Sequence, residues 1–297
     1  MSKNFAVYGS EVVFVTLQLN GKTLTTTAAN NNVITLYSSV NFHLDGADKD
    51  GKNGKIYNAG HSGGLIYTQN KTEYSGINAL VENVDYTATN MSQGYSTGQY
   101  KDQPMCHFNV GTLTMRNVNM TFTGADATAV AGSVGGADLT KMVMRFMQCN
   151  GSGTVNIEDC TFTDTNTKGI MTIGIEAGNG SKVTVKNSKF KTYTGIKATN
   201  GAIDVRDCEI ESSYAVFDGS SIIKVTDTVA KAGASGKLVN GGAKLYFLYG
   251  EGKNELHSAS DISGSHTVQT GYTLEKANGV YTMKGDSSVE ADRKSVV

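Results

Sequence analysis

The chain has 297 residues with 35 glycines, one proline and no tryptophan, a composition typical of short strands and tight turns rather than of helices. Its 26 basic and 27 acidic residues are spread along the chain and give a formal charge of −1, so no nucleic-acid partner is expected. No apolar run approaches the ~20 residues that a membrane span needs, so membrane insertion is not expected either.

The first candidate strands come in a similar pair, residues 17–21 (LQLNG) and 42–46 (FHLDG), which are 25 residues apart. Upstream of them, the start of the chain lacks a basic segment followed by a long apolar stretch, so no signal peptide is expected there. We therefore expect the chain to be excised from a longer, secreted precursor.

Residues 45–54 (DGADKDGKNG) form the most acidic segment of the chain. Calcium prefers oxygen ligands, so Asp45, Asp48, Asp50 and Asn53 are candidate calcium ligands, and calcium is the one cofactor that the sequence suggests. The EF-hand pattern is incomplete, because Ala59 occupies the position of its bidentate glutamate. A solvated turn is the alternative interpretation.

Residues 81–86 (VENVDY) resemble a further strand segment and are followed by a polar excursion, near 87–107, that carries Tyr95 and Tyr100. Loops on rigid scaffolds often carry binding function, and tyrosine rings suit sugar or protein contacts. We therefore predict Tyr95 and Tyr100 as ligand-binding residues. A second excursion, near 124–140, is rich in Ala and Gly.

Five segments align without gaps and alternate apolar with polar residues, which predicts strands. They are residues 111–117 (GTLTMRN), 153–159 (GTVNIED), 181–187 (SKVTVKN), 201–207 (GAIDVRD) and 221–227 (SIIKVTD). Fixed segments at variable spacing indicate the coils of a solenoid with excursions of different length.

The last aligned column contains only Asn and Asp, and the apolar parity shifts by one residue after it. Asn and Asp tolerate the left-handed conformation better than other non-glycine residues. We therefore predict a turn ladder that joins two strands of each coil, formed by Asn117, Asp159, Asn187, Asp207 and Asp227.

Two further features support this register. Cys160 and Cys208 share a column with Ser188 between them, which places them ~10 Å apart, too far for a disulfide, so both are predicted to be buried free thiols. Residues 174–177 and 195–198 predict a third strand. We therefore expect an all-β, single-stranded, right-handed parallel β-helix over residues 1–245, with about three strands per coil.

The repeat stops at about residue 246. Residues 272–283 alternate around Asn278-Gly279, which favours a β-hairpin, so residues 246–285 are predicted to cap the solenoid. Residues 286–297 are polar and charged and are predicted to be a disordered tail.

Residues 15–24 (VTLQLNGKTL) and 271–283 (GYTLEKANGVYTM) resemble the opening and closing elements of β-helix repeat regions in adhesin-like surface proteins of gut Gram-positive bacteria. The resemblance implies an extracellular or cell-surface location. Adhesins, autotransporter passengers and polysaccharide lyases share this right-handed, pectate-lyase-like style of solenoid.

No catalytic constellation is recognisable. The outward residues of the aligned strands mix both charges, as on a solubilising surface, and the histidines (His43, His61, His107, His257 and His266) lack metal-ligand spacing. The sequence thus favours a non-enzymatic surface module, an adhesin or spacer that presents loops to a host or environmental polysaccharide or surface protein. A polysaccharide lyase or glycoside hydrolase with a lateral groove and a phage receptor-binding spike are the alternatives, and open coil ends suggest end-to-end self-association.

Overall fold

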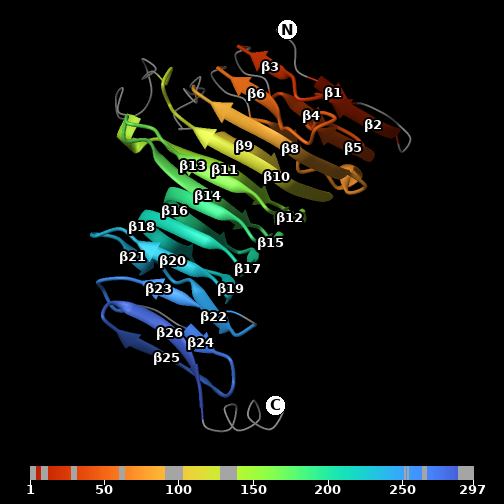
Figure 1. Ribbon diagram of the computed structural model, residues 1–297. Coiled ribbons are helices and arrows are strands. Elements are labelled where there is room, and N and C mark those ends of the chain that lie inside the picture. Colours follow the sequence, from red (N-terminus) through yellow and green to blue (C-terminus); the bar gives the residue numbers. More distant parts are fainter. Residues whose placement is uncertain are drawn as a thin grey trace.

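The computed structural model describes residues 5–7, 13–27, 32–59, 64–90, 103–127, 139–250, 252, 254–262 and 266–286. The described residues form 26 strands and two short 3-10 turns, η1 (Thr72–Tyr74) and η2 (Leu139–Lys141). Strands from successive coils pair in parallel and stack from the N-terminal end to the C-terminal end of an elongated molecule (Figure 1). The fold is therefore a parallel β-helix.

The strands of the coils form three faces. The first face contains β2 (Val13–Gln18), β5 (Val40–Asp45), the first halves of β8 (Asn78–Ala88) and β10 (Thr112–Phe122), β12 (Thr154–Glu158), β15 (Lys182–Lys186), β17 (Ala202–Arg206), β19 (Ile222–Thr226), β22 (Lys244–Leu248) and β24 (His266–Val268). The second face contains β3 (Thr23–Thr26), β6 (Gly54–Asn58), the second halves of β8 and β10, β13 (Thr161–Asp164), the first halves of β16 (Lys189–Thr199) and β18 (Glu209–Gly219), β20 (Val229–Ala232) and β23 (Glu255–His257). The third face contains β1 (Phe5–Val7), β4 (Ile34–Leu36), β7 (Ile66–Thr68), β9 (Gln103–Phe108), β11 (Val143–Asn150), β14 (Met171–Gly178), the second halves of β16 and β18, and β21 (Lys237–Val239).

The predicted register of the aligned strands is confirmed. Leu113 pairs with Val155, Val155 with Val183, and the column continues through Ile203 to Ile223. All five side chains are buried, because alternate residues of a strand face the same side and here face the interior. The inward columns of the three faces merge into one apolar core along the axis.

The first pair of coils has a different register from the expected one. Leu17 pairs with Leu44, an offset of 27 residues instead of 25. A shift of two residues leaves every side chain on the same face, so alternation alone does not distinguish the two registers.

The corner between the first and second faces is built from left-handed residues. Asn117, Asp159, Asn187, Asp207 and Asp227 have φ between 45° and 55°. Neighbouring corners are linked by amides: Asn187 Nδ2 donates to Asp159 Oδ1 at 2.5 Å, and Asn117 Nδ2 donates to Asn83 Oδ1 at 2.9 Å. The change in parity in the sequence is therefore a sharp bend of the backbone.

Cys160 and Cys208 are buried free thiols, as their shared column with Ser188 predicts, and the other two cysteines, Cys106 and Cys149, are buried free thiols as well. Burial raises the pKa of the Cys160 and Cys208 thiols to about 12, although backbone hydrogen bonds lower it. Ser188 Oγ donates to the carbonyl of Lys186 and accepts from the Cys160 amide. These residues act as small core side chains beneath the corner.

The parallel coils extend beyond the expected end at residue 245, since β22 pairs with β19, β23 with β20, and β24 with β22. The predicted hairpin follows as β25 (Tyr272–Ala277) and β26 (Val280–Gly285), with positive φ at Asn278 and Gly279. β26 lies antiparallel to β23 and covers the edge of the last second-face strand. Among the described residues, no helix has the length and apolarity that crossing a membrane requires.

Candidate functional site

The acidic segment at residues 45–54 lies at the corner between β5 and β6. Asp48 Oδ1 accepts the amides of Asp50 and Lys52, both at 2.9 Å, and these hydrogen bonds hold the pKa of Asp48 below its ordinary value. Asp50 pairs with Lys49 at 2.8 Å, and Asn53 Nδ2 donates to Asp85 at 3.0 Å.

Each of these side chains therefore has a partner, which for Asp48 and Asp50 lies within the turn and for Asn53 lies on β8. Among the described residues, the only group of three or more metal-ligating His, Cys, Asp or Glu side chains joins Asp45 to His43 and Glu82, without Asp48 or Asp50. Of the four predicted calcium ligands, the structure thus places Asp45 alone in a potential metal site.

Tyr95 and Tyr100 lie outside the described residues, as does most of the excursion near 87–107 that carries them and of the one near 124–140. Their predicted role in binding a ligand therefore stays a prediction. The described part of the chain offers two other features on the outer surface: a row of hollows along the second face and the side-chain group around His43.

The row of hollows follows two columns of outward side chains on the second face, and we call it the second-face groove. One hollow of about 540 Å³ lies over β3, β6 and the second halves of β8 and β10, and a second of about 500 Å³ lies over β13, β16, β18 and β20. The two hollows adjoin, because Asn119 and Thr121 in the first hollow are the direct strand partners of Thr161 and Thr163 in the second.

Polar side chains line the groove throughout. They are Thr23, Thr25, Lys55, Tyr57, Asp85, Thr87, Asn119 and Thr121 in the first hollow and Thr161, Thr163, Lys189, Lys191, Glu209, Glu211 and Lys231 in the second. In the second hollow Glu211 of β18 lies between Lys191 of β16 and Lys231 of β20. Glu209 lies between Lys189, with which it pairs at 3.0 Å, and Val229. The groove thus offers many hydrogen-bonding groups of mixed charge.

A smaller hollow of about 220 Å³ continues the groove toward the third face and shares Lys191 and Glu211 with its neighbour. Tyr193 lines this hollow and stacks on Tyr214, with ring centroids 5.0 Å apart and ring planes 3° from parallel. Tyr214 is 38% exposed. The stacked pair places aromatic side chains beside polar groups, a combination that suits contact with a sugar.

The sequence alignment missed Tyr193 and Tyr214 because their spacing is irregular. Tyr193 directly follows Thr192, whereas Tyr214 follows two serines, Ser212 and Ser213. The pairing of β16 with β18 shifts its register at this point. The tyrosines are therefore 21 residues apart while the neighbouring strands repeat every 20. A search that allowed one insertion between coils would have aligned them.

The third face carries a buried ionic group. Arg145 Nε donates to Glu176 Oε2, and Lys197 Nζ lies 3.2 Å from Glu176 Oε1. Burial raises the pKa of Glu176, but Arg145 and Lys197 outweigh it and hold that pKa below its ordinary value. His107 lies nearby on β9, and burial lowers its pKa to about 4.

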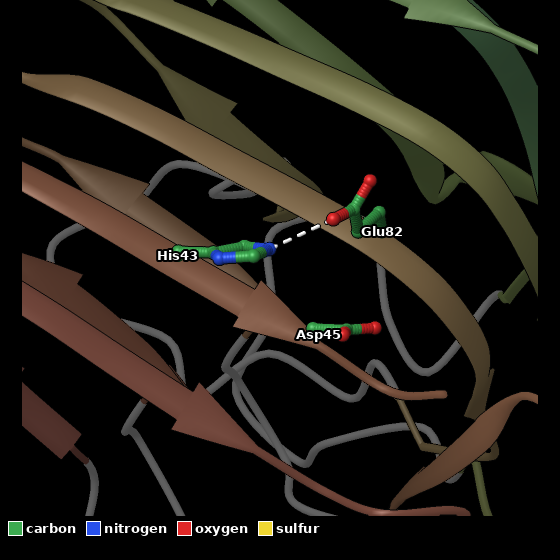
Figure 2. Close-up of side chains that lie close together, drawn as sticks. All are labelled: His43, Asp45 and Glu82. Atoms are coloured by element: carbon green, nitrogen blue, oxygen red, sulfur yellow. Dashed lines mark hydrogen bonds and ion pairs between the residues drawn. The ribbon is translucent and has the colours of Figure 1, made fainter. Parts of the chain in front are cut away.

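His43, Asp45 and Glu82 lie together on the outer side of the first face (Figure 2). His43 Nε2 and Glu82 Oε1 are 2.9 Å apart, and the two side chains are 35% and 19% exposed. The sequence did not indicate this group, because His43 and Glu82 are 39 residues apart and meet only through the pairing of β5 with β8.

Comparison of the chain with protein-family models, with curated proteins and with solved structures finds no significant match.

Proposed function

We propose that the chain is a non-enzymatic extracellular module, a rigid β-solenoid that binds a host or environmental polysaccharide along the second-face groove. The observation that carries the proposal is the groove itself, which is long, open and polar and continues to the stacked rings of Tyr193 and Tyr214. An extended polymer of hydroxyl-rich units needs repeated hydrogen bonds along its length and flat apolar surfaces for its ring faces.

The scaffold suits this role because the groove is built on paired strands. Every second-face strand from β3 to β23 is held by parallel neighbours, so the spacing between successive polar groups is fixed by the ladder at ~4.8 Å per coil. Binding an extended chain therefore requires little ordering of the protein, which favours affinity. The extracellular location rests on the resemblance of residues 15–24 and 271–283 to surface proteins.

A binding role is favoured over hydrolysis by the arrangement of charges in the groove. Glycosidic cleavage commonly uses two carboxylates on opposite sides of the bond, one as acid and one as base or nucleophile. Here Glu209 and Glu211 lie on one strand, β18, and each faces a lysine of β16, Lys189 or Lys191. Asp164 of β13 lines the smaller hollow together with Glu211, but its two oxygens already accept hydrogen bonds from Thr172 Oγ1 and Asn166 Nδ2. Such an arrangement suits hydrogen bonding to hydroxyls and to charged substituents.

The test is a binding and turnover screen of the purified chain on immobilised host and plant polysaccharides. We expect retention without release of reducing ends, and a loss of affinity of roughly fivefold when Tyr193 or Tyr214 is replaced by alanine, since each ring supplies stacking of about 1 kcal/mol. Tyr246→Ala is the matched control, because Tyr246 is 36% exposed but lies on the first face.

Equal weakening by Tyr214→Ala and Tyr246→Ala would place binding elsewhere. Release of oligosaccharides would replace the proposal with an enzyme, and no retention on any polysaccharide would refute it. Circular dichroism of each variant establishes that the change is in binding and not in folding.

A further inference from the structure

The group of His43, Asp45 and Glu82 is preorganised by the sheet. His43 and Asp45 are two residues apart on β5, so both point outward, and the parallel register places Glu82 of β8 beside Asp45. The imidazole nitrogen and one oxygen of each carboxylate lie within 4.8 Å of one another. Because all three residues lie in paired strands, the ladder fixes their backbone positions before a ligand binds.

Two carboxylates lie side by side at one point of this column of side chains. Beyond Glu82 each neighbour is opposite in charge, through Arg116 and Glu158 to Lys186, until Lys186 pairs with Arg206. Asp45 and Glu82, by contrast, lie directly opposite each other, and like charges in this position destabilise a sheet. A cation bound between them relieves this repulsion.

The carboxylate of Asp45 is held in place by three donors. Its Oδ1 accepts Asn83 Nδ2 and the amide of Ala47, both at 2.9 Å, and its Oδ2 accepts Gln18 Nε2 at 2.8 Å. These hydrogen bonds hold the carboxylate in one orientation.

The carboxylate of Glu82 is oriented from its far side. Its Oε2 lies 3.4 Å from Arg116 Nη1, which leaves Oε1 directed at His43 Nε2. Arg116 also pairs with Glu158 at 3.6 Å, so its charge stays compensated when Glu82 contributes Oε1 to a cation. The net charge of Asp45, Glu82 and Arg116 is −1, which still attracts a cation.

We propose that His43, Asp45 and Glu82 bind one divalent cation of the zinc class, with water in the remaining coordination positions. Calcium takes six to eight oxygen ligands, whereas one imidazole nitrogen with two carboxylates is a set that zinc accepts. On binding, the cation replaces the hydrogen bond between His43 and Glu82. A neutral imidazole that carries its proton on Nε2 transfers it through solvent to Nδ1, so that the Nε2 lone pair coordinates.

This site lies on the first face and does not depend on the second-face groove. Zinc binding is therefore measured without polysaccharide, by titration calorimetry of the full chain with any affinity tag removed. We expect one Zn²⁺ per chain, with binding weakened at least about tenfold by His43→Gln and by Glu82→Gln. His257→Gln is the control and leaves binding unchanged, because His257 faces one carboxylate, Glu255, at 3.7 Å on the second face.

Arg116→Gln gives a second, opposite readout. Removing the positive charge that lies 3.4 Å from Glu82 strengthens zinc binding several-fold if Glu82 is a ligand, and leaves it unchanged if the ion binds elsewhere. Absence of zinc binding at about 100 µM, parent-like binding by His43→Gln, or a preference for calcium over zinc would each overturn the proposal.

Discussion

At the scale of single residues, the corners show how one side chain fixes the path of the backbone. A left-handed residue costs roughly 1–2 kcal/mol when it is neither glycine nor a short polar residue. The corners avoid this cost because each left-handed position is an Asn or Asp, namely Asn117, Asp159, Asn187, Asp207 and Asp227. Asn117 and Asn187 also donate an amide hydrogen bond to the preceding coil. The sequence revealed these corners because conformation and chemistry coincide in one column.

The buried His107 is predicted to make the free energy of unfolding depend on pH. Burial keeps its imidazole neutral in the folded chain until about pH 4, whereas the unfolded chain takes up the proton at its ordinary pKa of 6.5. Protons therefore favour the unfolded state as the pH falls from 6.5 to 4, and the free energy of unfolding falls with it by roughly 2–3 kcal/mol from this group.

Urea unfolding of the parent and of His107→Gln at a series of pH values measures this contribution. The variant, which cannot take up the proton, is expected to show a shallower decline over the same window. Parallel curves for the two proteins would mean that His107 does not resist protonation in the fold.

At the scale of the strand, alternation and parallel register together decide stability. Val185 is fully buried, with Ile157 and Val205 as its partners on adjacent strands, whereas its neighbour Thr184 is exposed. The same strand therefore contains a core position and a surface position one residue apart.

Val185→Asp is expected to unfold the chain, because an unpaired carboxylate in a stacked apolar core costs several kcal/mol. Thr184→Asp introduces the same charge on the outer side, opposite Asp204 of β17, and is expected to lower the free energy of unfolding by no more than about 1 kcal/mol. Circular dichroism and size-exclusion chromatography compare the two, and a folded Val185→Asp would contradict the register.

At the scale of the whole molecule, the two ends of the stack differ. The C-terminal end is covered by the hairpin β25–β26, whose Tyr281 and Met283 are buried against the last coil. At the N-terminal end, the inward residues Val15, Leu17 and Leu24 of the first coil are only partly buried. Unpaired strand edges promote association, so the hairpin limits it at its end of the solenoid.

A chain shortened to end at Val268 is expected to unfold at lower temperature and to self-associate, because it loses the strand that pairs with β23. A chain that ends at Asp286 keeps the whole hairpin and serves as the control. Light scattering and thermal denaturation distinguish them, and identical behaviour would show that the hairpin is not a cap.

The sequence by itself determined the solenoid, its core columns, its corners and its hairpin, because each depends on alternation or on a backbone conformation that one residue type tolerates. It did not determine the offset of the first two coils, since a two-residue slip preserves the alternation of Leu17 and Leu44. Only the tertiary structure brought Tyr193 to Tyr214 and His43 to Glu82, because coils of unequal length set which residues become neighbours across the sheet. The surface sites therefore depend on distances along the chain that no local pattern encodes.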